Sequence, residues 1–245
     1  MNTEDRSDER KIFSGRGINR RDFLGLTSLA ILAACNAEPG DKTLPALQSG
    51  QKFNDAVQGA VFSKTKLAKE YPESEATPES GFRVNGKDDG PPKFDVANWH
   101  LEIVGLVKHP GIYTLDVLKT FPKRVMTTKH VCVEGWSMNP KWGGTLLSLV
   151  LRAAGVDEDA KYLSAECWDD YYVPYDMASV MHPQTLLCYE AYSKPLTLEH
   201  GGPVRIVMPT KLGYKSAKWL KKLTVTNEKP GGYWEDQGYD WFAGL

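Results

Sequence analysis

The stretch HVCVEGWSMNPKWGG, residues 130–144, places a cysteine directly after a strand-like run and directly before a tight aromatic loop. Gly135 permits a sharp backbone turn, and Trp136 supplies a large rigid wall close to Cys132. A thiolate in such a place is either a nucleophile or a soft metal ligand. Taken alone, a cysteine beside a strand is more often a small buried hydrophobic residue. The choice therefore depends on the rest of the sequence.

A second segment, EHGGPVRIVMPTKLGYKSAKWLKKL, occupies residues 199–223. It has the form His-Gly-x-Pro-x-Arg, followed by a strand that ends in proline, then Gly-Tyr-Lys and Lys-Trp-Leu. The two segments, in this order, resemble the active-site segment and the second signature of the sulfite-oxidase family of molybdopterin enzymes. The resemblance covers residues 82–227. It is strongest to bacterial periplasmic members of the family, such as methionine-sulfoxide reductase catalytic subunits, which share the Cys-Val-Glu-x-Trp-Ser segment and a twin-arginine signal.

This resemblance implies a molybdenum-molybdopterin cofactor, with one pyranopterin dithiolene on the metal and Cys132 as the protein sulfur ligand. It also implies an enzyme, an oxidoreductase that carries out two-electron oxygen-atom transfer on a small sulfur or nitrogen oxo-compound. The direction stays open between reduction of an S- or N-oxide and oxidation of sulfite or a related compound. The alternative is a non-enzymatic lipoprotein that kept the fold as a binding or scaffold module.

Further cofactor contacts follow from the resemblance, position by position. His200 and Arg205 would hold the pterin phosphate, and Ser216, Ala217 and Lys218 match the loop that contacts the same group. Arginine suits this task because its planar fork binds phosphate bidentately, although a surface ion pair is the plainer alternative. Lys215 either assists these residues or is one more solvated lysine.

Three other predictions rest on weaker alignment. Cys167 falls beside the cofactor in the resemblance, but a plain core cysteine is about as consistent with its surroundings. In the segment before the core, Asn85 is a cofactor candidate and Arg83 could face an anionic substrate. Tyr172 and its neighbour Tyr171 are candidate pocket tyrosines or, alternatively, packed or rim aromatics. The remaining histidines show no metal-ligand spacing and are predicted to be structural or exposed: His100, His109, His130 and His182.

The N-terminus predicts export. Arg20-Arg21 precede a 12-residue apolar run, Phe23–Ala34, which is too short to span a bilayer because a spanning helix needs about 20 residues. Paired arginines before such a run match the twin-arginine signal, read by a translocase that carries folded proteins. We therefore predict a signal peptide at 1–34 and a periplasmic location.

Leu32-Ala33-Ala34-Cys35 also resembles a bacterial lipobox, which would make Cys35 a lipidated anchor; ordinary cleavage nearby is the alternative. The sequence from 35 to 81 is rich in Pro, Gly, Ser, Glu and Lys and predicts a tether and irregular arm. Residues 82–227 form the predicted cofactor domain and 228–245 a tail. With 30 basic and 31 acidic residues the chain is nearly neutral, which argues against a nucleic-acid partner.

Strand-like runs outnumber helical ones and do not alternate regularly with them, so we predict an α+β fold with a mixed sheet, the sulfite-oxidase-like molybdopterin-binding fold. No haem motif such as Cys-x-x-Cys-His follows the second signature. We therefore expect electrons to be exchanged with a separate protein, either a cytochrome b membrane subunit or a soluble cytochrome c. Predicted strands lie at 100–104, 125–133, 162–167, 186–191, 204–208 and 222–226, and predicted helices at 115–121 and 146–154.

Overall fold

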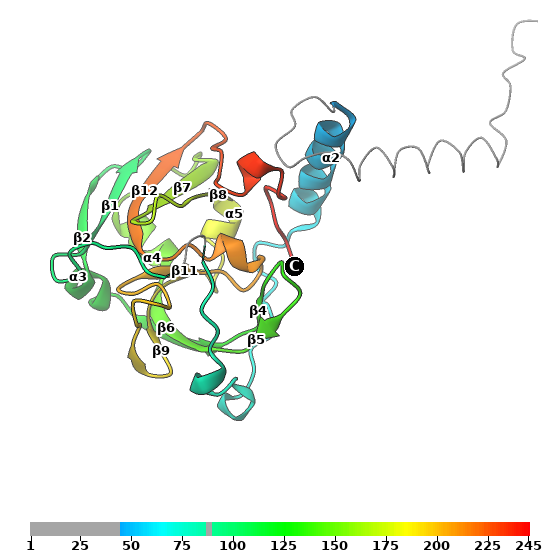
Figure 1. The fold of residues 1–245 in the computed structure, drawn as a ribbon. Helices are drawn as coiled ribbons and strands as arrows, with labels where there is room; N and C mark the ends of the chain where they lie inside the picture. The colour runs from blue at the N-terminus through cyan, green and yellow to red at the C-terminus, as the bar shows by residue number, and fades with distance from the viewer. Residues whose placement is uncertain (1–44, 87–89) are drawn as a thin grey trace, which may run out of the picture. The chain divides into compact units, whose positions relative to one another are not determined.

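Two β-sheets with short helices around them make up the part of the chain that the computed structural model describes, residues 45–86 and 90–245 (Figure 1). The first sheet has the strand order β2-β1-β12-β7-β8. β1 pairs with β12 in parallel, whereas the other pairs in this sheet are antiparallel, so the sheet is mixed as predicted. Its strands are β1 (His100–Gly105), β2 (Gly111–Thr114), β7 (Tyr162–Cys167), β8 (Tyr172–Asp176) and β12 (Leu220–Thr226).

The second sheet has the order β10-β9-β6-β3, and β11 pairs with β9 away from this path. A glycine is required where β6 meets β9, since a Cβ on Gly144 would lie 2.2 Å from the carbonyl oxygen of Leu187. A separate two-stranded hairpin, β4–β5, carries the first motif. These strands are β3 (Lys123–Thr127), β4 (His130–Val131), β5 (Ser137–Met138), β6 (Lys141–Leu146), β9 (Leu186–Ala191), β10 (Lys194–Pro195) and β11 (Arg205–Val207).

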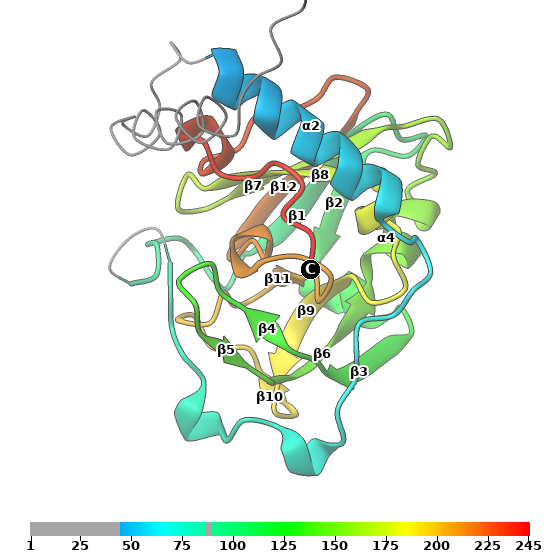
Figure 2. The same ribbon diagram turned by 90° about the vertical axis from the view of Figure 1, so that its right-hand side faces the viewer.

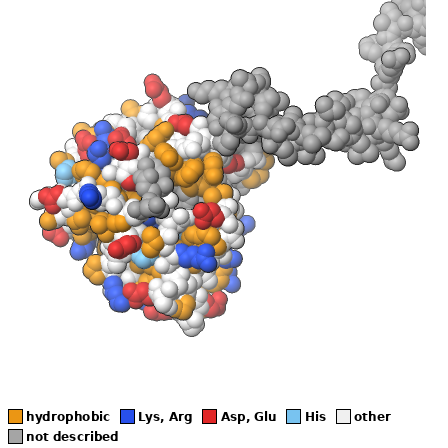
Figure 3. Space-filling view, viewed as in Figure 1, with side chains coloured by type: hydrophobic (Ala, Val, Ile, Leu, Met, Phe, Trp, Pro, Cys, Tyr) orange, Lys and Arg blue, Asp and Glu red, His pale blue; other side chains and the backbone are white. Residues whose placement is uncertain are grey.

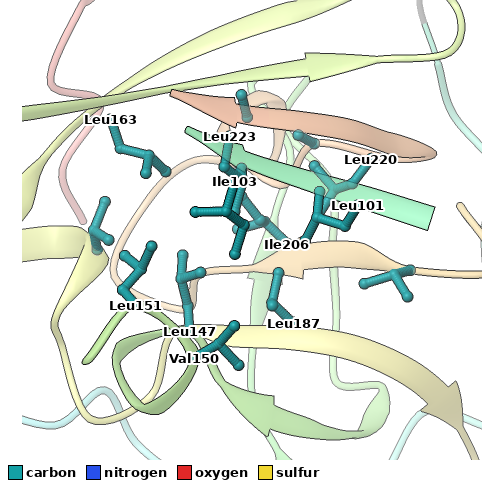
Figure 4. Close-up of a cluster of buried hydrophobic side chains, with 14 of the residues drawn as sticks. Leu101, Ile103, Leu147, Val150, Leu151, Leu163, Leu187, Ile206, Leu220 and Leu223 are labelled. Atoms are coloured by element: carbon teal, nitrogen blue, oxygen red, sulfur yellow. The ribbon is translucent and has the colours of Figure 1, made fainter. Parts of the chain in front are cut away.

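The main hydrophobic core lies between the two sheets (Figure 4). β1 and β7 alternate between buried and half-buried side chains, as strands do when one face packs on a core. From the other side, β9, β11 and helix α4 (Leu147–Ala153) contribute Leu187, Ile206, Leu147 and Leu151, which are fully buried or nearly so. The other helices within residues 100–245 are α3 (Leu115–Lys119), α5 (Met177–Val180), η3 (Gly213–Lys215) and η4 (Glu235–Gln237).

Most predicted elements are present. The strands expected at 162–167 and 186–191 match β7 and β9, and the helix expected at 146–154 matches α4. The strand-like run 125–133 is divided between β3 and β4. Neither β6 nor the short strand β8 was predicted. Two adjacent glycines lower the strand propensity of Trp-Gly-Gly in β6.

The arm preceding the core is more regular than predicted. Its described part begins with a 17-residue helix, α2 (Pro45–Val61), and continues through two short 3₁₀ helices, η1 (Glu73–Glu75) and η2 (Glu79–Gly81). Tyr71 N–H donates to Thr127 O (2.9 Å), so the arm runs along the edge strand β3. Tertiary contacts therefore hold this segment in place, although its composition is that of a loop. The predicted twin-arginine signal and Cys35 lie outside the described residues.

The C-terminal segment, residues 228–245, packs onto the core of the domain. Tyr233 N–H donates to Tyr172 O (2.9 Å), and Leu245 N–H donates to Thr210 O (3.1 Å). Figure 2 shows α2 lying across this segment. It is therefore part of the folded domain, rather than an appended tail.

Basic and acidic side chains are intermingled on the face shown in Figure 3. Within residues 45–86 and 90–245, no helix is both long enough and apolar enough to cross a membrane.

Candidate active site

Cys132 lies in the turn of the β4–β5 hairpin, at the wall of a cavity. Its backbone N–H donates to Trp136 O (2.9 Å), and Gly135 N–H donates to Cys132 O (3.1 Å). Gly135 has a φ of 90°, a conformation that side chains disfavour, which explains the glycine in the motif. The turn thus presents the thiol of Cys132, a residue that is 9% exposed, to the cavity.

A small polar network surrounds this thiol. Glu134 accepts hydrogen bonds from Trp136 Nε1 (2.9 Å) and Asn85 Nδ2 (3.1 Å). These two bonds hold the pKa of the Glu134 carboxyl below its usual range. Cys132 Sγ lies 3.7 Å from Asn85 Nδ2 and 3.8 Å from Glu134 Oε2. The guanidinium of Arg83 stacks on Trp136, 5.3 Å from the ring centroid. The upstream segment and the hairpin therefore meet at Cys132.

Arg205 is a buried cation on β11 and is 6% exposed. Its Nη1 donates to His200 O (2.9 Å) and its Nη2 donates to Ser216 O (3.0 Å), whereas its buried Nε has no partner. Burial lowers the pKa of Arg205 to about 10. No carboxylate among the described residues forms an ion pair with it. Since burying an unpaired charge is unfavourable, this site is suited to an anionic group.

Two residues of the loop after η3 line the same cavity. Ser216 Oγ is buried without a hydrogen-bond partner. Burial, and then the neighbouring charge of Arg205, lower the pKa of Lys218 to about 7. An anion close to Lys218 would raise this pKa again, because it stabilises the charged form of the lysine. An unpartnered hydroxyl, a buried guanidinium and a lysine together fit a phosphate-sized ligand.

His200 positions the upstream segment. Its ring stacks on Phe82 with centroids 3.7 Å apart, and its Nε2 lies 3.1 Å from Phe82 O. Burial is the main cause that lowers the pKa of His200. The imidazole therefore holds the chain just before Arg83 against the second motif.

The cavity brings together most of the predicted site residues and leaves three outside its lining. Cys167 is buried, and burial raises the pKa of its thiol well above the usual value. Ala217, in the loop after η3, is buried, and the Tyr172 hydroxyl donates to Asp236 Oδ2 of the C-terminal segment (2.7 Å). Its neighbour Tyr171 is the one that lines the cavity. The predicted residues in the lining are Arg83, Asn85, Cys132, His200, Arg205, Ser216 and Lys218.

The interpretation of Lys215 as a solvated lysine is wrong, and its side chain is not part of the cavity lining. Its side chain is 1% exposed, so it is not solvated, and it forms an ion pair with Glu235 away from the cavity lining. It therefore fixes the loop from behind.

Several cavity residues gave no clear signal in the sequence. His130, predicted to be structural or exposed, lies half-buried at the cavity wall, and burial of its ring lowers its pKa to about 3. Its Nε2 would be 2.9 Å from a Cβ on Gly213, so this glycine lets the η3 loop approach. Tyr214, Trp234 and Tyr239 also line the cavity, the last two from the C-terminal segment. Within residues 45–86 and 90–245, no three His, Cys, Asp or Glu side chains form a group that could hold a metal ion.

Comparison with known families decides what this cavity belongs to. The model of the oxidoreductase molybdopterin-binding domain matches residues 89–234, which include both sequence motifs and most of the cavity. This chain belongs to the oxidoreductase molybdopterin-binding family. It is an oxidoreductase with the sulfite-oxidase-like fold, so the interpretation as a non-enzymatic module is not supported.

Relatives within this molybdopterin-binding family are similar over different lengths. A provisionally named protein-methionine-sulfoxide reductase subunit of Azospira oryzae is 43% identical over 92% of this chain and 87% of its own length. An uncharacterized oxidoreductase of Bacillus subtilis is 34% identical over 65% of this chain and 81% of its own. The protein-methionine-sulfoxide reductase catalytic subunit of Campylobacter jejuni is 30% identical over 58% of this chain and 54% of its own.

A solved structure is also similar to this chain. The sulfane dehydrogenase SoxCD of Paracoccus pantotrophus superimposes with a TM-score of 0.53 at 27% sequence identity. The match covers 57% of this chain and 41% of the dehydrogenase chain.

Proposed function

We propose that this cavity holds one molybdenum-molybdopterin cofactor, with Cys132 as the protein sulfur ligand of the metal. The observation that carries the proposal is the pairing of two features in one cavity. A thiol lies in the hairpin turn, and a buried guanidinium without a carboxylate partner lies close to the unpartnered hydroxyl of Ser216. A soft thiolate suits the metal, and the guanidinium and hydroxyl suit the terminal phosphate of the pterin.

Each group of residues has a distinct task in this arrangement. Arg205, Ser216 and Lys218 bind the phosphate, and His200 holds the upstream segment against them. Asn85 orients the Cys132 thiolate through its amide N–H at 3.7 Å. When bound, the cofactor supplies two-electron oxygen-atom transfer, with electrons exchanged one at a time.

The cavity supports reduction of a neutral S-oxide better than oxidation of sulfite. The Glu134 carboxylate lies 3.8 Å from Cys132 Sγ and is exposed at the cavity, so it offsets the attraction that the neighbouring Arg83 guanidinium would have for an anion. A sulfoxide carries no net charge, and its oxygen can accept a hydrogen bond from the Arg83 guanidinium. Trp136 is the wall on which Arg83 rests. The names of the relatives in Azospira and Campylobacter point to the same substrate class, methionine sulfoxide.

The same proposal places the enzyme outside the cytoplasm. The twin-arginine sequence Arg20-Arg21 would direct the folded, cofactor-loaded chain to its translocase, and Cys35 would anchor the product to a membrane through a lipid. Electrons would then come from a separate protein, a cytochrome b membrane subunit or a soluble cytochrome c. The word "subunit" in the names of the relatives is consistent with such a partner.

Metal analysis combined with an activity screen tests this function. The purified protein should contain about one molybdenum per chain. With an artificial electron donor it should reduce methionine sulfoxide, and with an artificial acceptor it should oxidise sulfite far more slowly. Protein without molybdenum would contradict the cofactor assignment. A molybdenum enzyme that prefers sulfite would contradict only the substrate assignment.

A further inference from the structure

Helix α2 carries its apolar face outward. Phe53, Val57 and Val61 recur at four-residue spacing, so they lie on one face of the helix. They are 72%, 42% and 76% exposed, and the small residues between them, Ala56 and Ala60, are exposed as well. These five residues, here named the α2 stripe, form an apolar ridge on the surface of the domain.

The opposite face of α2 is polar and faces the domain. Asn54 and Gln58 both donate to the Asp240 carboxylate of the C-terminal segment. Gln58 Oε1 also accepts from Gly244 N–H (2.9 Å), and Lys229 Nζ donates to Asp55 (3.0 Å). A surface helix of a globular protein normally buries its apolar side and exposes its polar side. These polar contacts fix α2 in the reverse orientation, so the stripe is not a surface left over from ordinary core packing.

We propose that the α2 stripe docks onto an anionic lipid bilayer, with Phe53, Val57 and Val61 inserted among the headgroups. The first argument is size. The stripe runs over nine residues of α2, 53–61, which is about 13 Å of a helix about 10 Å wide, so it offers roughly 130 Å². A stable protein interface needs about 800 Å² on each side. One apolar helix face is instead the usual membrane contact of peripheral proteins.

The charges that follow the stripe agree with a bilayer. Lys64, Lys66 and Lys69 come directly after α2 and are exposed, and Leu67, between two of them, is 53% exposed. Lysines mixed with apolar side chains are typical of segments that bind anionic headgroups.

The position of α2 in the chain points the same way. The undescribed N-terminal residues, 1–44, end directly before α2 begins, and Cys35 lies ten residues before Pro45. Ten residues span at most about 35 Å, so a lipid on Cys35 would keep α2 close to the membrane. One lipid chain alone binds a membrane only weakly, and stable attachment needs a second membrane contact. Helix α2 would supply that second contact. This step rests on the export proposed above.

Docking through α2 would also orient the active site. The side chain of Asp240 accepts the hydrogen bonds from α2, and its backbone oxygen accepts a hydrogen bond from the Tyr214 hydroxyl (2.6 Å). Tyr214 in turn lines the cavity. The same C-terminal segment contributes Trp234 and Tyr239 to the cavity wall. The helix at the bilayer is thus joined to the cavity by two successive contacts.

A depth measurement tests the docking without depending on which signal anchors the chain. The processed holoenzyme carries a nitroxide at Val57→Cys, or at Ala60→Cys if the first variant misfolds. It is bound to vesicles of equal parts phosphatidylglycerol and phosphatidylcholine. The label at Ile112→Cys, a 64% exposed apolar position on β2, is the matched control. Holoenzyme without a new cysteine gives the background from Cys132, Cys167 and Cys188, which are buried.

On adding vesicles, the ratio of oxygen to nickel-chelate accessibility should rise several-fold at position 57 and stay unchanged at position 112. An unchanged ratio at position 57 in vesicle-bound protein would overturn the proposal. So would a label at position 57 that is already shielded without vesicles in a dimer, because a second copy would then cover the stripe. Molybdenum content and sulfoxide reduction, measured on the same samples, report on the proposed function separately.

Discussion

Lys215 and Glu235 form an ion pair in which the two side chains are only 1% and 3% exposed. Lys215 Nζ also donates to Pro174 O (3.0 Å), and Lys215 O accepts from the Tyr175 hydroxyl (2.6 Å). The pair joins η3, directly before Ser216, to η4 in the C-terminal segment. The loop proposed to bind phosphate is thus fixed by residues that do not touch the cavity.

Removing one partner of this pair should be costly. Glu235→Ala leaves Lys215 buried and unpaired, and we expect a loss of about 3–5 kcal/mol in the free energy of unfolding, measured by urea denaturation. The double variant Lys215→Met/Glu235→Leu should recover most of this loss because it removes both charges. A loss below about 1 kcal/mol in Glu235→Ala would show that the pair is not buried in solution.

Lys211 should make stability depend on pH in the alkaline range. It is 3% exposed, its Nζ donates to Phe242 O (2.8 Å), and burial lowers its pKa to about 7 from an ordinary value of 10.5. Between these two values the unfolded chain binds a proton that the folded chain does not, so this contribution to stability rises with pH. It is lost as the pH falls from 10.5 through 7.

Comparison with Lys211→Met isolates that contribution. The difference in unfolding free energy, wild type minus variant, should increase between pH 7.5 and 9.5 by up to about 1.4 kcal/mol per pH unit. A difference that stays constant over this range would mean that Lys211 keeps its ordinary pKa in the folded protein.

Substitution of Ser216 should weaken cofactor binding without changing the stability of the fold. Because Ser216 Oγ has no partner in the protein, Ser216→Ala should leave the melting temperature of the cofactor-free protein unchanged. The same variant, purified with its cofactor, should contain less molybdenum than the wild type. Arg205→Ala should weaken cofactor retention by one to two orders of magnitude, since each charge-assisted bond contributes about 1.5–3 kcal/mol, and should therefore be purified with sub-stoichiometric molybdenum. Arg205→Lys should recover only part of it, as lysine lacks the planar fork. Full metal content in all three variants would exclude this anchoring site.

Export is tested by fractionation of cells. Arg20→Lys together with Arg21→Lys should leave the precursor in the cytoplasm, because the translocase reads the guanidinium pair. Labelling with a radioactive fatty acid, with Cys35→Ala as the control, tests lipidation separately. Periplasmic maturation of the double-lysine variant would contradict the twin-arginine signal, and an unlabelled wild type would mean ordinary cleavage.

Long local motifs made the centre of the site predictable from sequence. Cys132 and Arg205 each lie in a segment whose neighbouring residues determine the local backbone conformation. Gly135, with its positive φ, is an example beside Cys132. The wall formed by Trp234 and Tyr239 could not be predicted in this way, because it depends on how a distant segment folds back. The outcome for Tyr171 and Tyr172 shows the same limit. Tyr171 lies directly before β8 and Tyr172 begins it, and only the position of this strand in the sheet decides which side chain enters the cavity.

Helix α2 was missed for a related reason. Its glycines and polar residues give a weak helical signal, and its contacts to Asp240 come from a segment more than 180 residues away in sequence. Strand β6 was missed because Gly144 is needed for close strand approach, although glycine disfavours strands.

X-ray absorption at the molybdenum edge of the purified enzyme tests the central claim most directly, by counting the sulfur atoms bound to the metal. We predict three sulfur ligands in the wild type, two from the dithiolene and one from Cys132, and two in Cys132→Ser, with loss of turnover and an altered Mo(V) resonance in a variant that remains folded. Three sulfur ligands in both proteins, or full activity in Cys132→Ser, would contradict the assignment of Cys132 as the metal ligand.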